Sequence, residues 1–290
     1  MLATHTERTP LRTNLEECTE MSSLTTKTHQ ASPMLTFTAF KTTRRNSAFD
    51  LPELVDELVG DRIMEGDVLV ISSKFIAISE GRIVSLDTVK PTGRAIDLAG
   101  RFEMQPELCE LILQESDEVI GGVPGFVLAL WNGLLTPNAG IDKSNIEHGR
   151  VVLYPKDSLE SANRIAMELR KRRGVSVGVV VSDSRLMPTR AGTVGVALAA
   201  VGVPAIVDKR GHPDLFGNPL KVTRQAVADD LCTAAQLVMG EADEATPIVL
   251  VRGLSTAGAE GTRFAPSDFA IPTDQCVYMR SFGYVRKSGT

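Results

Sequence analysis

The sequence predicts an α+β fold with mixed, largely antiparallel sheets and flanking helices. Apolar runs with strand spacing and runs with helical spacing alternate along the chain from about residue 34 onward. Their order is mixed and does not follow the strict strand–helix–strand repeat of a parallel sheet. The 290 residues are 43% hydrophobic and 23% charged, a balance typical of a globular chain that buries its core without disulfides.

The two ends of the chain differ from its middle. Residues 1–34 are rich in Thr, Ser and Glu and have no apolar periodicity, which predicts a disordered N-terminal tail. We expect residues 35–254 to form the catalytic region, which could divide into two subdomains. Residues 255–290 are rich in Gly and Ser and are expected to form a loosely packed C-terminal segment.

The first half of the chain contains one helix with clear start signals. Helical spacing predicts it over Leu51–Val59, with Asp50 as the N-cap and Pro52 close to the first turn. Apolar runs and turn signals predict the other elements of this half, namely strands over 34–40, 66–72, 81–86 and 126–131 and a helix over 103–114.

The second half contains the strongest predicted strand, over 175–182, which we expect to stop at Asp183. This would place the Asp183 carboxylate at a strand end, where open sheets carry their chemistry. A helix is predicted over Leu159–Arg173, because a basic last turn is followed by Gly174. The remaining elements are an Ala-rich helix over 223–239 and a core strand over 247–252.

Composition excludes several classes of function. The net charge of −5 gives no electrostatic case for nucleic-acid binding. The four cysteines are far apart and form no Cys-x-x-Cys pair, which suits a reducing cytosol. The sequence has no membrane-spanning apolar run and no secretory signal, so we expect a cytoplasmic protein. It also has no P-loop, no Gly-x-Gly-x-x-Gly motif and no nucleophile elbow, so the chemistry must come from carboxylates, hydroxyls and backbone amides.

Asp142 is the first candidate site residue. It lies in a loop between two strands and is followed by Ser144 and Asn145. Carboxylate, hydroxyl and amide oxygens are hard ligands that suit Mg²⁺ or Mn²⁺. The alternative is an Asx-type turn, in which Asp142 and Asn145 only satisfy backbone amides.

Asp183 and Ser184 are the second candidates, because a carboxylate beside a hydroxyl can reach one cation or two neighbouring ones. The alternative is a helix or turn cap. Arg185 and Arg190 follow, and an arginine near such a site could clamp a phosphate or a carboxylate.

Two further segments could contribute. Glu241 lies in a loop between a helix and a strand, where it could supply a third oxygen ligand and where loop amides could hold phosphates. The alternative is an acidic surface loop. Lys74, at the end of an apolar strand, could bind phosphate as a point charge or be a solvated strand end.

Taken in order, these segments resemble the coenzyme F420-0:L-glutamate ligase family. The resemblance covers about residues 35–254 and rests on several motifs together. They include Asn138-Ala-Gly-Ile-Asp-Lys-Ser-Asn145, the Val-Val-Val-Ser-Asp-Ser run that ends at Ser184, and Pro247-Ile-Val-Leu-Val-Arg-Gly253.

The resemblance implies an intertwined homodimer with a mixed α+β fold, which adds L-glutamate to the deazaflavin cofactor F420-0 with GTP and Mg²⁺ or Mn²⁺, two cations per site. It implies metal ligation by Asp142, Asp183, Ser184 and Glu241. It implies GTP contacts from Ser73, Lys74, Asn145, Met239, Gly240, Ala242, Asp243, Glu244, Ala245 and Thr246. Asp142, Asp183 and Arg190 form the predicted catalytic set, in which Arg190, together with Lys209, is a candidate for holding an anionic substrate group.

The chain departs from the family pattern in four places. Lys41-Thr-Thr-Arg-Arg45 replaces a Gly-Leu-Pro or Gly-Ile-Pro start, and Ile78 stands where the family has a lysine. Arg185-Leu-Met-Pro-Thr-Arg190 replaces a Gly-Arg-Pro-Trp-Arg stretch, and Glu241 replaces a glutamine. Two other hypotheses therefore stay open: an amide ligase for a different small carboxylate, and a nucleotide- or cofactor-binding protein without turnover.

Overall fold

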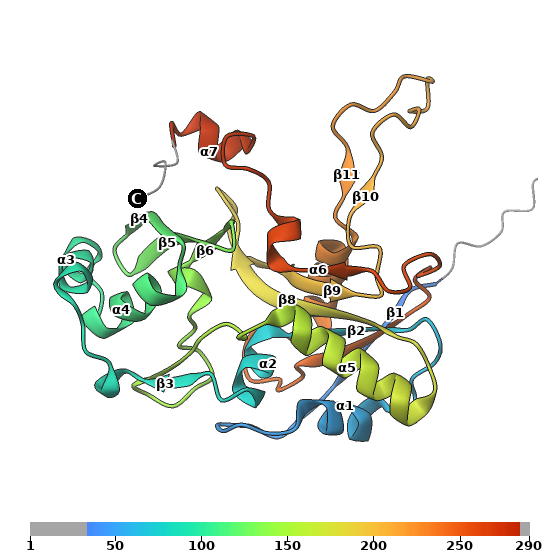
Figure 1. Ribbon diagram of the computed structural model, residues 1–290, viewed down its shortest axis with the longest axis horizontal. Helices are drawn as coiled ribbons and strands as arrows, with labels where there is room; N and C mark the ends of the chain where they lie inside the picture. The colour runs from blue at the N-terminus through green and yellow to red at the C-terminus, as the bar shows by residue number, and fades with distance from the viewer. Residues whose placement is uncertain (1–33, 285–290) are drawn as a thin grey trace, which may run out of the picture. The chain divides into compact units, whose positions relative to one another are not determined.

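The computed structural model describes residues 34–284, so the tail predicted over 1–34 lies almost wholly outside the described residues (Figure 1). At its centre is a six-stranded sheet with the order β1-β12-β2-β8-β9-β13, in which β2 and β8 run parallel and the other neighbours antiparallel. Its strands are β1 (Thr36–Phe40), β12 (Ile248–Arg252), β2 (Val68–Ser72), β8 (Gly178–Leu186), β9 (Thr193–Val201) and β13 (Arg263–Phe264). This architecture confirms the predicted α+β class with largely antiparallel sheets.

Helices cover both faces of the central sheet because its inner strands are apolar on both sides. In β2, Leu69 and Ile71 pack in one core cluster, and Val68 and Val70 pack in another on the opposite face. The first cluster includes side chains from α1 (Leu51–Val59), α2 (Ser73–Ser79) and α5 (Ser158–Arg173). The second includes side chains from α6 (Val227–Met239).

A second group of elements lies beside the central sheet and has its own core (Figure 1). Its antiparallel meander consists of β4 (Glu118–Val123), β5 (Phe126–Trp131) and β6 (Leu134–Pro137). Its helices are α3 (Gly93–Phe102) and α4 (Pro106–Glu115). The short ladder of β3 (Ile83–Ser85) with β7 (Arg150–Val152) leads back to α5. Ala139 and Ile141, in the segment from β6 to β7, pack in the second core.

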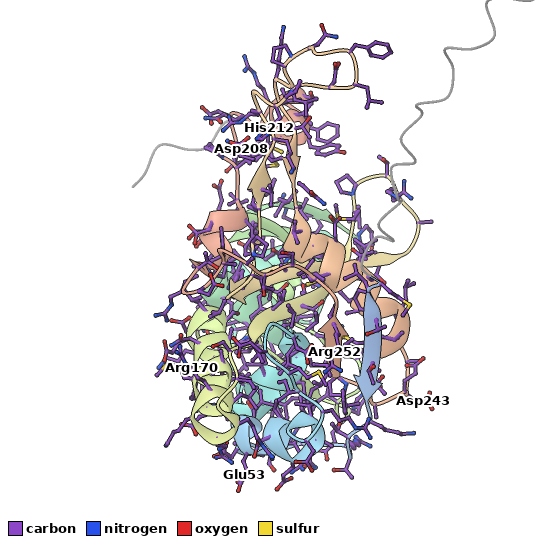
Figure 2. The ribbon with its side chains drawn as sticks, turned by 90° about the vertical axis from the view of Figure 1, so that its right-hand side faces the viewer. Glu53, Arg170, Asp208, His212, Asp243 and Arg252 are labelled. Atoms are coloured by element: carbon purple, nitrogen blue, oxygen red, sulfur yellow. The ribbon has the colours of Figure 1, made fainter. Side chains whose placement is uncertain are left out.

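A long hairpin built on β10 (Val207–Asp208) and β11 (Arg224–Gln225) projects away from the sheet (Figures 1 and 2). Leu215 and Phe216 near its tip are fully or almost fully exposed. After β13 comes the short helix α7 (Val277–Ser281). The prediction that 255–290 packs loosely stays a prediction. None of the helices described between residues 34 and 284 is both long enough and apolar enough to cross a bilayer.

Most predicted elements form, including the Asp50 cap, whose carboxylate accepts a hydrogen bond from the Glu53 amide at 3.1 Å. The predicted end of the strand before Asp183 is wrong. β8 continues to Leu186, because β9 extends the hairpin and pairs Asp183 with Val196. The parallel ladder with β2 does end at Ser182, so Asp183 lies one residue beyond the carboxyl end of that ladder.

Three of the described α-helices are absent from the sequence prediction, namely α2, α3 and the short α7. α2 follows β2 without a loop, and its apolar residues are buried all round, so they show no amphipathic spacing. α3 precedes the predicted helix over 103–114, which begins at Pro106 because Glu103 ends α3 with a positive φ of 53°. α6 begins at Val227 instead of residue 223, because Arg224 and Gln225 pair with β10.

Candidate functional site

A pocket of about 900 Å³ opens at the carboxyl end of the parallel β2–β8 ladder. Phe126 and five longer segments that are distant in sequence line it. The segments lie within residues 42–45, 72–78, 136–154, 182–193 and 236–247. The pocket therefore joins the central sheet to the loop between β6 and β7 and to the loop after α6.

Asp183 lies on the more buried side of this pocket, and its side chain is 19% exposed. One carboxylate oxygen accepts a hydrogen bond from the Ser73 hydroxyl at 3.2 Å, and the other accepts a short hydrogen bond from the Tyr154 hydroxyl. Burial raises the pKa of Asp183, while Arg185 and the two hydrogen bonds oppose that rise and the charge of Asp142 adds to it. Because Asp183 lies within a strand and bonds to side chains, the alternative that it is a helix or turn cap is wrong.

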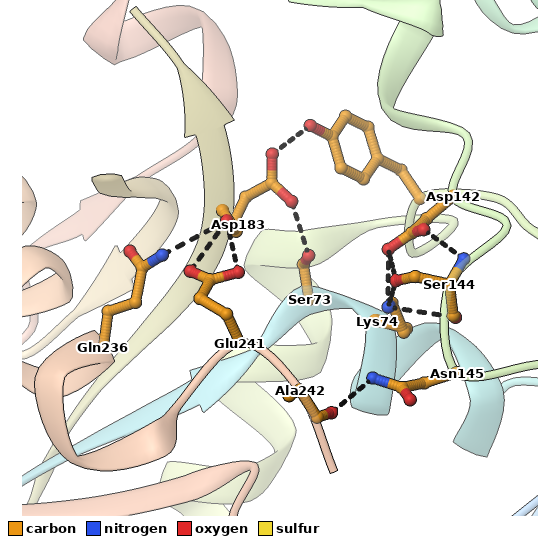
Figure 3. A network of polar contacts seen from close by, with 11 residues as sticks. Ser73, Lys74, Asp142, Ser144, Asn145, Asp183, Gln236, Glu241 and Ala242 are labelled. Carbon is orange, nitrogen blue, oxygen red and sulfur yellow. Dashed lines mark hydrogen bonds and ion pairs between the residues drawn. The ribbon is translucent and has the colours of Figure 1, made fainter. Parts of the chain in front are cut away.

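Asp142 lies on the other side and pairs with a lysine. Lys74 Nζ is 2.5 Å from Asp142 Oδ2 and donates to the Ser144 hydroxyl at 2.7 Å (Figure 3). The other oxygen, Asp142 Oδ1, accepts from the Ser144 amide at 2.6 Å. The Asx-type turn is therefore present, and it holds one oxygen of Asp142 while the second faces Lys74.

Backbone strain shapes the segment before Asp142. Asn138, Ala139 and Gly140 have positive φ angles of 49°, 52° and 77°. Asn and Gly tolerate this left-handed region, whereas alanine does so at a free-energy cost. The Asn138 side chain is buried and accepts from the Val127 amide at 2.9 Å, which fixes the strained segment against β5.

Ser184 points to the opposite side of β8 from Asp183, as consecutive strand residues do. Its hydroxyl lies 3.0 Å from both Glu241 carboxylate oxygens and accepts from Gln236 Nε2 at 3.1 Å (Figure 3). Thr193 on β9 donates to Glu241 at 3.2 Å. Ser184 and Glu241, predicted from widely separated motifs, are thus direct neighbours.

The loop after α6 contributes all of its predicted residues to the pocket lining, from Met239 through Thr246. Gly240 ends the helix with φ of 74°, and Asn145 Nδ2 donates to the Ala242 carbonyl at 2.7 Å, which joins this loop to the Asp142 segment. Every predicted metal- and nucleotide-binding residue lines this one pocket. Arg190 does not line it: it is exposed in the loop between β8 and β9.

Sequence reasoning did not single out Tyr154, and it weighed Arg185 only as one arginine among several. Arg185 donates from Nη2 to the Tyr154 hydroxyl at 3.1 Å and lies 3.5 Å from Asp183 Oδ2. A signal for Arg185 was present, because residues two apart in a strand share a side and Arg185 follows Asp183 by two. Tyr154 follows β7 and carries no such signal.

The donor set fits a magnesium or manganese ion. Asp142, Asp183, Ser184 and Glu241 offer hard oxygen atoms in one pocket. Within residues 34–284 no three His, Cys, Asp or Glu side chains cluster closely enough to form an all-protein cage. This pattern suits Mg²⁺, which is usually held by one or two carboxylates together with water and substrate phosphates.

Comparison with known proteins identifies the family of this chain. The family model described as F420-0:Gamma-glutamyl ligase matches residues 42–253. A coenzyme F420:L-glutamate ligase from Methanopyrus kandleri is 42% identical over 206 residues, which cover 71% of this chain and 81% of the relative. Proteins of the same name from Methanothermobacter thermautotrophicus and Archaeoglobus fulgidus are 41% and 39% identical over 195 and 209 residues, covering 67% and 72% of this chain and 77% and 83% of theirs.

The relatives are all named as ligases, so the chain belongs to a family of ligases. The family match extends over every residue that lines the pocket. The chain belongs to the F420-0:gamma-glutamyl ligase family, which confirms the resemblance found in its motifs.

Proposed function

We propose that this chain is a GTP- and divalent-metal-dependent ligase that adds L-glutamate to coenzyme F420-0 through an acyl phosphate. The observation that carries the proposal is the convergence of four oxygen donors, Lys74 and the loop after α6 on one pocket. The names of the relatives supply the substrate class, since they are coenzyme F420:L-glutamate ligases.

The proposed reaction has two steps. A carboxylate oxygen of the acceptor attacks the γ-phosphorus of GTP, which forms an acyl phosphate and releases GDP. The amine of L-glutamate then attacks the acyl carbon, orthophosphate leaves, and the new amide nitrogen gives up a proton. Both steps depend on positioning and charge neutralisation more than on covalent chemistry by the protein.

The chain's own residues have distinct roles in this scheme. Asp142, Asp183, Ser184 and Glu241 would hold the metal, which when bound neutralises charge on the phosphate oxygens. Lys74 adds a positive charge beside Asp142. The loop after α6 lines the same pocket, where its backbone amides would donate hydrogen bonds to phosphate oxygens. A homodimer and a cytoplasmic location remain predictions from the sequence.

The test incubates the purified protein with F420-0, L-glutamate, GTP and Mn²⁺ and measures the product by mass. We expect one or more added glutamates, with release of GDP and phosphate. Asp183→Asn should lower kcat/KM by about 10²- to 10³-fold, while the protein stays folded because the two side chains have the same shape. The matched control is Asp97→Asn, since Asp97 is exposed on α3, and it should keep the wild-type rate.

The outcomes separate the three hypotheses. No product with either GTP or ATP contradicts the proposal. Metal-dependent phosphate release without glutamylated F420 would favour an amide ligase for another carboxylate. Nucleotide binding without hydrolysis would favour a protein that binds its ligands without turnover.

A further inference from the structure

Arg185 is a cation whose hydrogen-bonding capacity is largely unused within the described residues. Its side chain is 10% exposed and lines the pocket. A guanidinium carries five N–H donors. The structure records one hydrogen bond from this group, to Tyr154, and Nε is buried without a partner in residues 34–284. Burying such donors unpaired is unfavourable, so the group is suited to an anionic ligand.

Asp183 does not saturate this guanidinium. Both of its oxygens already accept hydrogen bonds, from Ser73 and from Tyr154. The distance from Arg185 Nη2 to Asp183 Oδ2 is 3.5 Å, longer than a well-formed hydrogen bond. Burial opposes the charged form of Arg185, but Tyr154, Asp183 and Asp229 together raise its pKa, so it stays charged.

Tyr154 gives the guanidinium a fixed support. The Tyr154 ring packs against Trp131 with the ring centroids 4.5 Å apart, and its side chain is almost fully buried. Its hydroxyl donates to Asp183 and accepts from Arg185, so it sets the separation of these two groups. A cation held in this way is preorganised to bind a planar anion in bidentate fashion.

We infer that Arg185, positioned by Tyr154, binds the α-carboxylate of the incoming amino acid. The inference rests on the proposed function. Two of the cations that line the pocket have different partners, since Lys74 contacts Asp142 and Arg185 contacts Asp183. In an α-amino acid the amine and the α-carboxylate share one carbon atom. Asp183 is one of the residues that would hold the metal at the phosphate. A clamp on the α-carboxylate beside Asp183 therefore also fixes the amine near the acyl phosphate.

The test compares Arg185→Gln with the wild type. The KM for L-glutamate should rise roughly 30-fold or more, as expected for the loss of a charged hydrogen-bonded pair. The kcat should change less, and Mn²⁺ binding without substrates should not weaken, because the variant removes a positive charge 3.5 Å from Asp183 Oδ2. Arg170→Gln is the matched control, because Arg170 is exposed on α5 outside the pocket. Tyr154→Phe keeps the ring and should raise KM in the same direction by a smaller factor.

Two analogues of L-glutamate identify which carboxylate is bound. L-2-aminobutyrate keeps the α-carboxylate and lacks the side-chain carboxylate, so Arg185→Gln should weaken its use as strongly as that of L-glutamate. 4-Aminobutyrate lacks the α-carboxylate, so the wild type and the variant should use it equally poorly. A KM effect on F420-0 in place of L-glutamate, or an effect that follows the side-chain carboxylate, would overturn the inference.

Equilibrium binding of L-glutamate, measured with GDP and Mn²⁺, tests the inference without turnover. We expect the Kd of Arg185→Gln to exceed that of the wild type by the same factor as KM. A wild type that binds L-glutamate through Arg185 yet makes no product contradicts the proposed function alone. If the wild type makes product and Arg185→Gln has the same Kd and KM for L-glutamate as the wild type, this inference alone is overturned. L-glutamate binding that does not depend on Arg185 overturns it as well.

Discussion

Asp183 and Ser184 are neighbours in one strand, yet they belong to two different environments. The Asp183 side is mostly buried and is closed by Ser73 and Tyr154. The Ser184 side is exposed, and Gln236 and Glu241 complete it. Two consecutive strand residues thus place oxygen ligands on both sides of β8. The electrostatic effect of each ligand depends on how deeply it is buried.

The difference comes from the way the two sides are built. The buried side forms where the β2–β8 ladder ends and α2 begins, so a side chain there meets packed secondary structure. The exposed side forms against α6, which approaches β9 closely because Gly195 has no side chain: a Cβ there would lie 2.4 Å from the Cys232 carbonyl oxygen. Changes on the buried side are therefore expected to have the larger effects.

The largest effect is expected from Asp183→Asn compared with Ser184→Ala. Loss of the buried charge should lower kcat/KM by about 10²- to 10³-fold, the range seen when one preorganised electrostatic group is removed. Ser184→Ala removes a solvated hydroxyl whose place water can take, so a loss below about tenfold is expected. Initial rates at saturating Mn²⁺ measure both. Equal losses would mean that burial does not distinguish the two sides.

Gly140→Ala should disrupt the hydrogen bonds around Asp183 without replacing any polar side chain there. A Cβ at Gly140 would lie 2.0 Å from the Tyr154 ring, and φ at this position is +77°. The ring would have to move, which displaces its hydroxyl from Asp183. We expect about 1–3 kcal/mol of destabilisation, together with a loss of activity. Urea unfolding and initial rates measure the two effects.

The control for this variant is Gly125→Ala. Gly125 also has a positive φ, of 85°, but a Cβ there meets nothing within 4 Å. It should therefore show backbone strain alone, with normal activity in the folded protein. If both variants keep full activity, the position of Tyr154 does not matter for the site.

Local sequence signals were sufficient where structure is made by neighbouring residues. The Asp50 cap, the Gly174 end of α5 and the apolar run of β2 all form as predicted. Local signals were insufficient where a strand partner far along the chain determines where an element ends. β8 runs past Asp183 because β9 pairs with it, and neither strand alone contains that information.

The site shows the same division. Motif order predicted that Asp142 and Asp183 would share a pocket, and they do. Tyr154 could not be predicted, because its role depends on contacts with residues 29 and 31 positions away along the chain. Arg190 was chosen for its charge, but the hairpin carries it out to solvent, while Arg185 turns inward on the same strand as Asp183.

A smaller effect is expected on the exposed side from Glu241→Gln. Glutamine keeps the oxygen and the shape but removes a negative charge, so the cation should bind more weakly. We expect the Mn²⁺ concentration for half-maximal rate to rise roughly tenfold, with little change in kcat at saturating metal. Rates measured across a Mn²⁺ titration test this. A large fall in kcat at saturation would show that Glu241 acts on the substrates as well as on the metal.

The smallest effect is expected on the stability of the metal-free protein. Asp183→Asn, which lowers activity, should raise the stability. Burial raises the pKa of Asp183 above its ordinary value of about 4. The folded state then binds a proton more readily than the unfolded chain, so stability falls as pH rises from the ordinary pKa through the raised one. Asp183→Asn removes this titration. In EDTA the inactive variant should have a higher Tm than the wild type at pH 7.

The difference in Tm should shrink as the pH is lowered toward 4, because the wild-type carboxyl becomes protonated and then resembles the neutral amide. Asp229 also has a pKa raised by burial, but it is present in both proteins and cancels in the comparison. Thermal unfolding between pH 4 and pH 7 measures the difference. A Tm difference that is constant with pH, or a variant less stable at pH 7, would mean that Asp183 is held in the metal-free protein by its hydrogen bonds more strongly than burial opposes it. The buried side of β8 would then differ from the exposed side in its hydrogen-bond partners, and not in a free-energy cost of burying the Asp183 charge.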